Sequence, residues 1–132
     1  MKKHIIISIF AVVVLLFTGF LLLKIFSPKV NISGEKAKLS YIYNDKNIIV
    51  DLSAEESKQL KEMFNGKKLY KDSPSCGFSK NISICFDESY FCIACDQCST
   101  VKHDNKYFNI SKAERKFLNG IFEKYGGSFP CV

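Results

Sequence analysis

The feature that most constrains this chain of 132 residues is an uncharged apolar run near its N-terminus. Between residues 5 and 23 only three polar or small residues interrupt it, and residues 25–26 continue it past Lys24. As an α-helix that rises 1.5 Å per residue, such a run covers roughly 30 Å, the thickness of a bilayer's hydrocarbon core. The run predicts a single transmembrane anchor over residues 5–26, preceded by a cytoplasmic flank over residues 1–4.

A cleaved signal peptide is the alternative interpretation, because Met1-Lys2-Lys3 resembles a positively charged n-region. The apolar region of a signal peptide normally has about 7 to 15 residues and is followed by a small-x-small cleavage site. Here the run is longer, and Phe17 stands two positions before Gly19, the best small residue. The pattern therefore favours an uncleaved signal-anchor.

Six cysteines indicate the compartment of the domain that follows. Small cysteine-rich domains are typical of oxidising environments outside the cytoplasm. Lysines flank the apolar run on both sides, so the count of positive charges does not decide its orientation and the cysteines do. We expect a single-pass protein of the cell membrane whose domain, residues 38–132, lies on the extracytoplasmic side after a linker over residues 27–37.

The formal net charge of +6 does not indicate a nucleic-acid partner. Four of the basic residues flank the apolar run, which leaves fifteen basic against thirteen acidic residues in the domain, about +2. A nucleic-acid-binding domain normally carries a much stronger basic footprint. Arg115 is the single arginine, a bias that weakens any hypothesis of bidentate phosphate recognition. The same preference for lysine is typical of an AT-rich genome, such as that of many bacteria. The flanking residues are Lys2, Lys3, Lys24 and Lys29.

Short runs rich in β-branched and aromatic residues predict two β-hairpins. Residues 39–43 and 48–52 flank the polar turn 44–47, and residues 82–86 and 90–94 flank a second polar turn. Residues 106–110 predict a further strand.

Two capping boxes predict the starts of two amphipathic helices. Ser53 with Glu56 precedes an apolar stripe that ends before residues 65–66, and Ser111 with Glu114 precedes one that ends at residues 126–127. The predicted fold class is therefore α+β: an N-terminal transmembrane helix followed by a small two-layer domain, in which an antiparallel sheet of two hairpins packs against two amphipathic helices. We expect the second helix to form the core with Phe117, Leu118, Ile121 and Phe122.

The two strand-to-helix segments also match each other at an offset of 58 residues. Ser53 corresponds to Ser111, Leu60 to Leu118 and Phe64 to Phe122. A duplicated hairpin-helix unit would explain the match. Independent recurrence of the capping box in two amphipathic helices explains it equally well, so both interpretations stay open.

Three chemistries compete for the cysteines. Structural disulfides are the first, because an even cysteine count in an extracytoplasmic domain is their usual signature. Metal binding is the second, because Cys92, Cys95 and Cys98 are spaced by three residues as in ferredoxins, although the fourth ligand of that pattern is Lys102 here. Thiol-disulfide exchange is the third, but no helix pattern follows the motif to stabilise a thiolate. The disulfide candidates are Cys76, Cys85, Cys92, Cys95, Cys98 and Cys131.

Alternation in the second hairpin predicts a register. If Ile84 faces Ile93 and Phe86 faces Phe91, Cys85 lies opposite Cys92, near enough for a disulfide if the two form a non-hydrogen-bonded pair. Cys95 and Cys98 would then pair with Cys76 and Cys131 in some order.

Motifs for catalysis are absent from the sequence: it has no phosphate loop, nucleophile elbow or H-E-x-x-H pattern, so we assign no catalytic residue, metal ligand or cofactor. His103 lies in a polar segment and is expected to be a solvated loop residue. Residues 75–78, the Cys92–Cys98 segment and the terminal Phe129-Pro130-Cys131-Val132 resemble small bacterial membrane-anchored cysteine-rich proteins that end in F-P-C-V. This resemblance, over about the last sixty residues, implies no activity, fold or ligand.

The function we expect is that of a non-catalytic interaction or sensing module, stabilised by disulfides, that binds a protein partner. The alternative is a thiol-exchange or metal-binding protein that uses the Cys92, Cys95 and Cys98 cluster.

Overall fold

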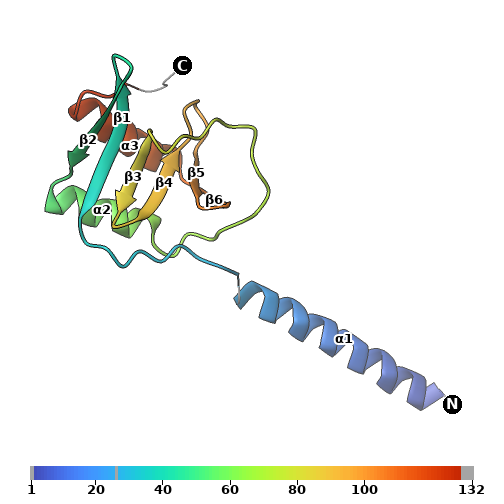
Figure 1. Cartoon of the computed structure of the whole chain (residues 1–132). Helices are drawn as coiled ribbons and strands as arrows, with labels where there is room; N and C mark the ends of the chain where they lie inside the picture. Colours follow the sequence, from blue (N-terminus) through green and yellow to red (C-terminus); the bar gives the residue numbers. More distant parts are fainter. Residues whose placement is uncertain (1, 26, 129–132) are drawn as a thin grey trace.

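The computed structural model describes the backbone of residues 2–25 and 27–128, with the side chains of residues 7–22 and 27–128. An N-terminal helix, α1 (Lys2–Ile25), extends away from a domain of six strands and two further helices (Figure 1). In chain order the domain contains β1 (Ala37–Tyr43), β2 (Lys46–Asp51), α2 (Ala54–Phe64), β3 (Ser83–Phe86), β4 (Ser89–Ile93), β5 (Thr100–His103), β6 (Lys106–Asn109) and α3 (Lys112–Lys124).

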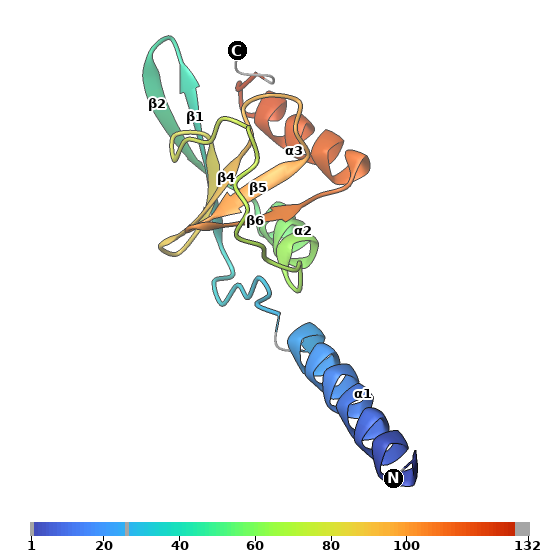
Figure 2. The same ribbon diagram turned by 90° about the vertical axis from the view of Figure 1, so that its right-hand side faces the viewer.

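Helix α1 corrects the sequence prediction. Its described side chains, those of residues 7–22, are exposed, and the helix extends away from the domain (Figure 2). A membrane span requires about 20 consecutive apolar residues to cover the hydrocarbon core. Among the described residues, no helix combines that length with sufficient apolar character. The predicted transmembrane helix over residues 5–26 and the predicted single-pass location in the cell membrane are therefore wrong.

The sheet is also larger than predicted. All six strands form one antiparallel sheet in the order β2-β1-β3-β4-β5-β6, built from three hairpins rather than two. The missed strand is β5, which pairs with β6 so that Val101 lies opposite Phe108. Residues predicted as the turn of the first hairpin also belong to the sheet, because only Asn44 and Asp45 form the turn and β2 starts at Lys46.

Helices α2 and α3 cover one face of this sheet (Figure 2). Phe64 of α2 is fully buried and contacts Phe91 and Phe108 of the sheet, with ring centroids 5.2 and 5.4 Å apart. From α3, Leu118, Ile121 and Phe122 are buried as predicted, whereas Phe117 is only partly buried. This shared apolar layer is the core of the domain.

Both predicted capping boxes are confirmed. Ser53 accepts a hydrogen bond from the Glu56 N–H, Ser111 accepts one from the Glu114 N–H, and each glutamate accepts in return from the N-cap backbone. Glu56 additionally accepts hydrogen bonds from Lys124 (2.6 Å) and the Tyr125 hydroxyl (2.7 Å), so it connects the start of α2 with the end of α3.

The segment predicted as a linker packs onto the domain. Val30 and Ile32 are buried, and the Val30 N–H donates to the Lys67 carbonyl at 2.9 Å. The Gly66 N–H donates in turn to the Val30 carbonyl, also at 2.9 Å. These bonds attach the segment to the chain just after α2, so residues 28–36 are part of the folded unit.

Candidate functional site

The cysteines occupy two regions of the domain. Cys85 and Cys92 lie on the two strands of the central hairpin, β3 and β4. Cys95 and Cys98 lie in the connection from β4 to β5, and Cys76 lies in the long connection from α2 to β3. Cys131 falls outside the described residues. The predicted cluster is thus divided between the sheet and the loops at its end.

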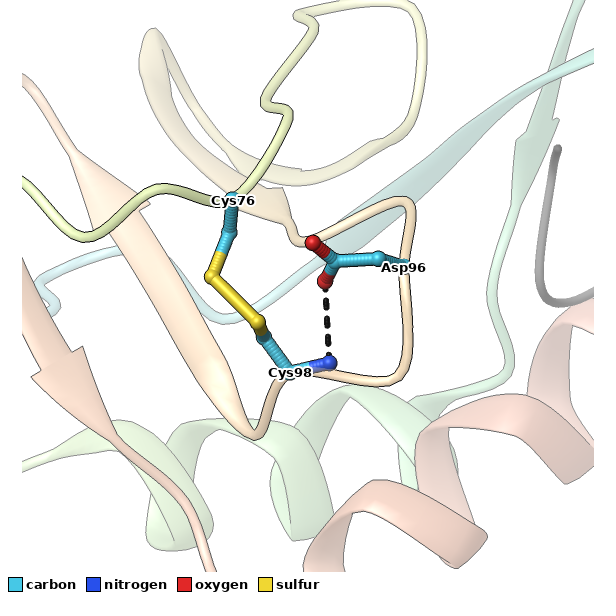
Figure 3. Close-up of side chains that lie close together, drawn as sticks. All are labelled: Cys76, Asp96 and Cys98. Atoms are coloured by element: carbon cyan, nitrogen blue, oxygen red, sulfur yellow. Dashed lines mark hydrogen bonds between the residues drawn. A yellow bond between two sulfur atoms is a disulfide. The ribbon is translucent and has the colours of Figure 1, made fainter.

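A disulfide joins Cys76 to Cys98 (Figure 3). It connects the loop before β3 with the loop after β4, 22 residues further along the chain. The Cys95 N–H donates to the Gly77 carbonyl at 3.0 Å, and Asp96 Oδ1 accepts from the Cys98 N–H at 2.9 Å. The two loops therefore form one covalently closed unit, which we call the cysteine loop pair (residues 75–78 and 94–99).

Arg115, in the first turn of α3, supports this loop pair from beneath. Its guanidinium donates to the carbonyls of Ala94 (2.9 Å), Asp96 (2.7 Å) and Cys98 (3.0 Å), and the residue is only 7% exposed. A planar guanidinium with five donors suits three converging carbonyls better than a lysine would. The sequence offered one indication that Arg115 has a specific role: it is the single arginine among nineteen basic residues, and it lies in a predicted amphipathic helix.

The predicted Cys85–Cys92 disulfide is wrong. Cys85 lies opposite Tyr90 and Cys92 lies opposite Ser83, because the hairpin turn has only two residues, Asp87 and Glu88. The register is shifted by two residues from the expected one. Both thiols therefore lie on the sheet face that is away from the helices, on adjacent strands but not directly opposite each other.

Neither of these two thiols is activated. Burial raises the pKa of the Cys92 thiol, and the nearby charges of Lys102 and Lys80 do not offset that rise. Burial also raises the pKa of Cys85, whose Sγ donates to the Asp87 carbonyl at 3.0 Å. Because the thiolate is the nucleophile, both environments disfavour thiol exchange.

Cys92 contributes to a pocket of about 450 Å³ on the outer face of the sheet. Its charged side chains comprise two lysines and two acidic groups, so the pocket favours neither anions nor cations. His103 lines a different hollow, next to Lys29 and Leu69, and is not the solvated loop residue predicted. Its ring stacks on Phe91 with centroids 4.4 Å apart, and Nδ1 lies 3.1 Å from the Tyr90 carbonyl. The pocket is lined by Phe78, Lys80, Glu88, Tyr90, Cys92, Lys102, Asp104 and Asn105.

The solvent side of α2 and α3 carries a shallow apolar groove. Two adjoining hollows of about 580 and 420 Å³ share Gln59, Ala113 and Phe117. Gly120 borders the larger hollow, and a Cβ placed there would have no neighbour within 4 Å. The groove is open, but no described segment of the chain occupies it.

Metal-ligating atoms converge at one place among the described residues. One ligand atom each from Cys76, Asp96 and Cys98 lies within 4.8 Å of the other two. This group differs from the predicted Cys92, Cys95 and Cys98 cluster and shares only Cys98 with it. In the structure its two sulfur atoms are bonded to each other, so they are not available as thiolate ligands.

The last candidate surface is the open edge of the sheet. β2 is an outer strand that pairs with β1 alone among the described residues. Its hairpin with β1 projects beyond the helices (Figure 2), and Ile49 is 64% exposed. Sequence reasoning missed this surface, because strand order cannot be read from local patterns.

Comparison with protein-family models, with curated proteins and with solved structures finds no significant match for this chain.

Proposed function

We propose that this chain is a non-catalytic interaction module that binds an extended segment of a protein partner along the β2 edge. The observation that carries the proposal is the difference between the two outer strands of the sheet. An open edge presents unpaired N–H and C=O groups, which an added strand can satisfy.

The opposite edge, β6, is closed by the chain itself. The Tyr70 N–H donates to the Tyr107 carbonyl and the Tyr107 N–H donates to the Tyr70 carbonyl, both at 2.9 Å. The Tyr70 hydroxyl also donates to Asn109 at 2.7 Å. β2 has no such cover among the described residues, and it contains neither proline nor a bulge to prevent pairing.

Exposed apolar side chains gather at the same edge. Within residues 27–128, the large hydrophobic side chains that are exposed are Ile42, Tyr43, Ile49 and Tyr90, and the first three belong to the β1–β2 hairpin. Single exposed apolar residues are ordinary on protein surfaces, but three of them on one hairpin beside an open edge favour an interaction site.

The rest of the domain supplies a rigid frame for this edge. β1 lies between β2 and β3 and pairs with both, so the hairpin is anchored in the sheet. The Cys76–Cys98 disulfide and Arg115 restrain the loops that precede β3 and follow β4, the two central strands of the sheet. A preorganised edge loses little conformational entropy on binding, which favours affinity.

Peptide display against the immobilised full chain tests the proposal. Ile49→Lys should weaken a selected peptide at least about tenfold, or about 1.4 kcal/mol, because a lysine replaces an apolar contact at the edge. Gly120→Lys is the matched control, since it adds the same charge in the helix groove. N-methylation of the peptide at alternate residues should abolish binding for one parity only, because strand addition uses every second N–H.

Loss of binding in Gly120→Lys with unchanged binding in Ile49→Lys would place the site in the helix groove and refute the proposal. A display library that yields no binder for the parent chain also counts against it.

A second candidate function is supported by the convergence of Cys76, Asp96 and Cys98. A two-electron thiol reductant would convert the disulfide into two thiols, whose thiolates, together with the Asp96 carboxylate, provide three of the four ligands that zinc prefers. We expect zinc to bind only after treatment with such a reductant and not to Asp96→Asn. Zinc binding that is equal with and without reductant would exclude this site.

A further inference from the structure

We propose that the occupant of the β2 edge is the β2 strand of a second copy of this chain, paired antiparallel about a two-fold axis at Ile49. The inference rests on the proposed function, because it names the partner of the same edge. The two sheets would then continue into each other, and the exposed hairpins would lie side by side.

Hairpin geometry determines which backbone groups of β2 face outward. The Asn44-Asp45 turn has positive φ at both residues (48° and 59°), as in a type I′ turn, so Tyr43 and Lys46 form the hydrogen-bonded pair that closes the hairpin. Bonding then alternates along the strand. The Leu52 N–H, which donates to the Ala37 carbonyl at 3.0 Å, agrees with this alternation.

The outward groups therefore belong to Asn47, Ile49 and Asp51. A two-fold axis at Ile49 brings Ile49 opposite its own copy and Asn47 opposite Asp51 of the other copy. These are hydrogen-bonded positions, so the pairing satisfies about six backbone bonds across the edge. It uses every outward group of the strand.

The side chains in this register match like with like. On the outer face, Ile49 meets Ile49 of the second copy. On the face toward the helices, the partly buried Ile48 and Val50 meet each other. Moving the axis to Ile48 would oppose Asn47 to Ile49, and moving it to Val50 would oppose Asp51 to Ile49. Both alternatives place a polar side chain against an apolar one.

Charge and hydrogen bonding favour the same register. Asn47 Oδ1 already accepts from the Ser40 hydroxyl at 2.9 Å, which leaves the amide NH₂ to donate across the edge. Its acceptor would be Asp51 of the second copy, whose carboxylate lies 4.0 Å from Nζ of Lys38. Lys38 and Asp51 of one copy then continue into Asn47 and Ser40 of the other copy as one row of polar side chains. The two-fold axis generates this row twice.

Cysteine cross-linking of the full chain tests the register. In a hydrogen-bonded antiparallel pair the Cα atoms are about 5.5 Å apart, which a disulfide can bridge. Ile49→Cys should therefore give an oxidised dimer. Asn47→Cys is the matched control, because its two copies would be separated by four residues along the strand, roughly 14 Å. The parent chain, which retains Cys85 and Cys92, provides the baseline.

Sedimentation of the full chain over a concentration series tests the association itself. Ile49→Lys should weaken the dimer at least about tenfold. Cross-linking of Asn47→Cys as efficient as that of Ile49→Cys overturns the register, and association that Ile49→Lys does not change overturns the second-copy inference. If Ile49→Lys leaves association unchanged but weakens the binding of selected peptides, the proposed function still holds and only the second-copy inference is refuted. If Ile49→Lys changes neither association nor peptide binding, both proposals are refuted.

Discussion

Glu56 is the residue whose replacement tests the packing of α2 against α3 most directly. Burial raises the pKa of this carboxyl, but hydrogen bonds from Lys124, Tyr125 and Ser53 outweigh burial and hold the pKa at about 2, down from 4.5. At 1.36 kcal/mol per pKa unit this corresponds to about 3 kcal/mol. Since the Lys124 side chain is 60% exposed, solvent screens part of it, and we expect Glu56→Gln to cost about 1 to 2 kcal/mol at neutral pH.

The pH dependence has a definite sign. The folded carboxyl stays charged down to about pH 2, whereas the unfolded one takes up its proton near pH 4.5. The stabilisation is therefore complete above pH 4.5 and is lost as the pH falls from 4.5 through about 2. The pKa of Glu114 is also lowered, because hydrogen bonds from Lys67 and Ser111 outweigh the effect of burial. This carboxyl is present in both the parent and Glu56→Gln, so its contribution to the pH dependence cancels when the two are compared.

Urea unfolding followed by circular dichroism measures the effect, because urea, unlike guanidinium, does not screen charges. The difference in unfolding free energy between parent and Glu56→Gln should shrink toward zero at pH 2. Glu62→Gln, an exposed site on the same helix, is the control and should change stability by less than about 0.5 kcal/mol. A cost for Glu56→Gln that is the same at pH 7 and pH 2 would refute the electrostatic explanation.

Four further variants have expected changes in unfolding free energy, all measurable by the same assay. Gly120→Ala should stabilise the folded domain by about 0.5 to 1 kcal/mol, because the residue is inside α3 and an added Cβ would meet open space. A lower unfolding free energy would mean that the added methyl group meets a neighbour. Phe122→Ala should cost about 3 to 5 kcal/mol, and an unchanged midpoint would exclude it from the core. The double variant Cys76→Ser with Cys98→Ser should lose about 3 kcal/mol for a loop of 22 residues, and no loss would mean that the bridge adds no stability. Asp45→Gly should gain about 0.5 to 1 kcal/mol, since type I′ turns prefer Asn-Gly, and destabilisation would contradict the turn assignment.

The features that the sequence predicted well are those that depend on a few neighbouring residues. A capping box needs only Ser53 and Glu56, or Ser111 and Glu114, at the right spacing, and both helices start where expected. The buried face of α3 follows from helical periodicity in the same way. Neither feature depends on what the rest of the chain does.

Turn length was the main source of error within the sheet. The first turn was expected over residues 44–47 but contains only Asn44 and Asp45, so β2 begins earlier. In the second hairpin the shorter turn shifts the register by two residues. Because side chains alternate with a period of two, Ile84 and Phe91 keep the predicted core face, while the cross-strand partner of Cys85 changes from Cys92 to Tyr90.

The convergence at the cysteine loop pair was not predictable for a different reason. Arg115 reaches the carbonyls of Ala94, Asp96 and Cys98 because α3 packs beneath the end of β4, a relation that no local motif contains. Asp96 was not among the candidate site residues predicted from the sequence. In the structure it accepts from the Cys98 N–H and lies beside the disulfide.

The strand order shows how the two hairpin-helix segments that match in sequence are arranged in the sheet. β1-β2-α2 and β5-β6-α3 lie at opposite ends of one sheet, with β3 and β4 between them, so β2 and β6 are equivalent outer strands. Their sequences do not distinguish which is closed. In the part of the chain that the structure describes, the difference comes from Tyr70, in the connection from α2 to β3, which pairs with Tyr107 and covers β6 but not β2. The open β2 edge, on which the proposed function depends, is thus a property of the whole topology. It arises because the second unit has a covering segment and the first unit has none among residues 2–25 and 27–128.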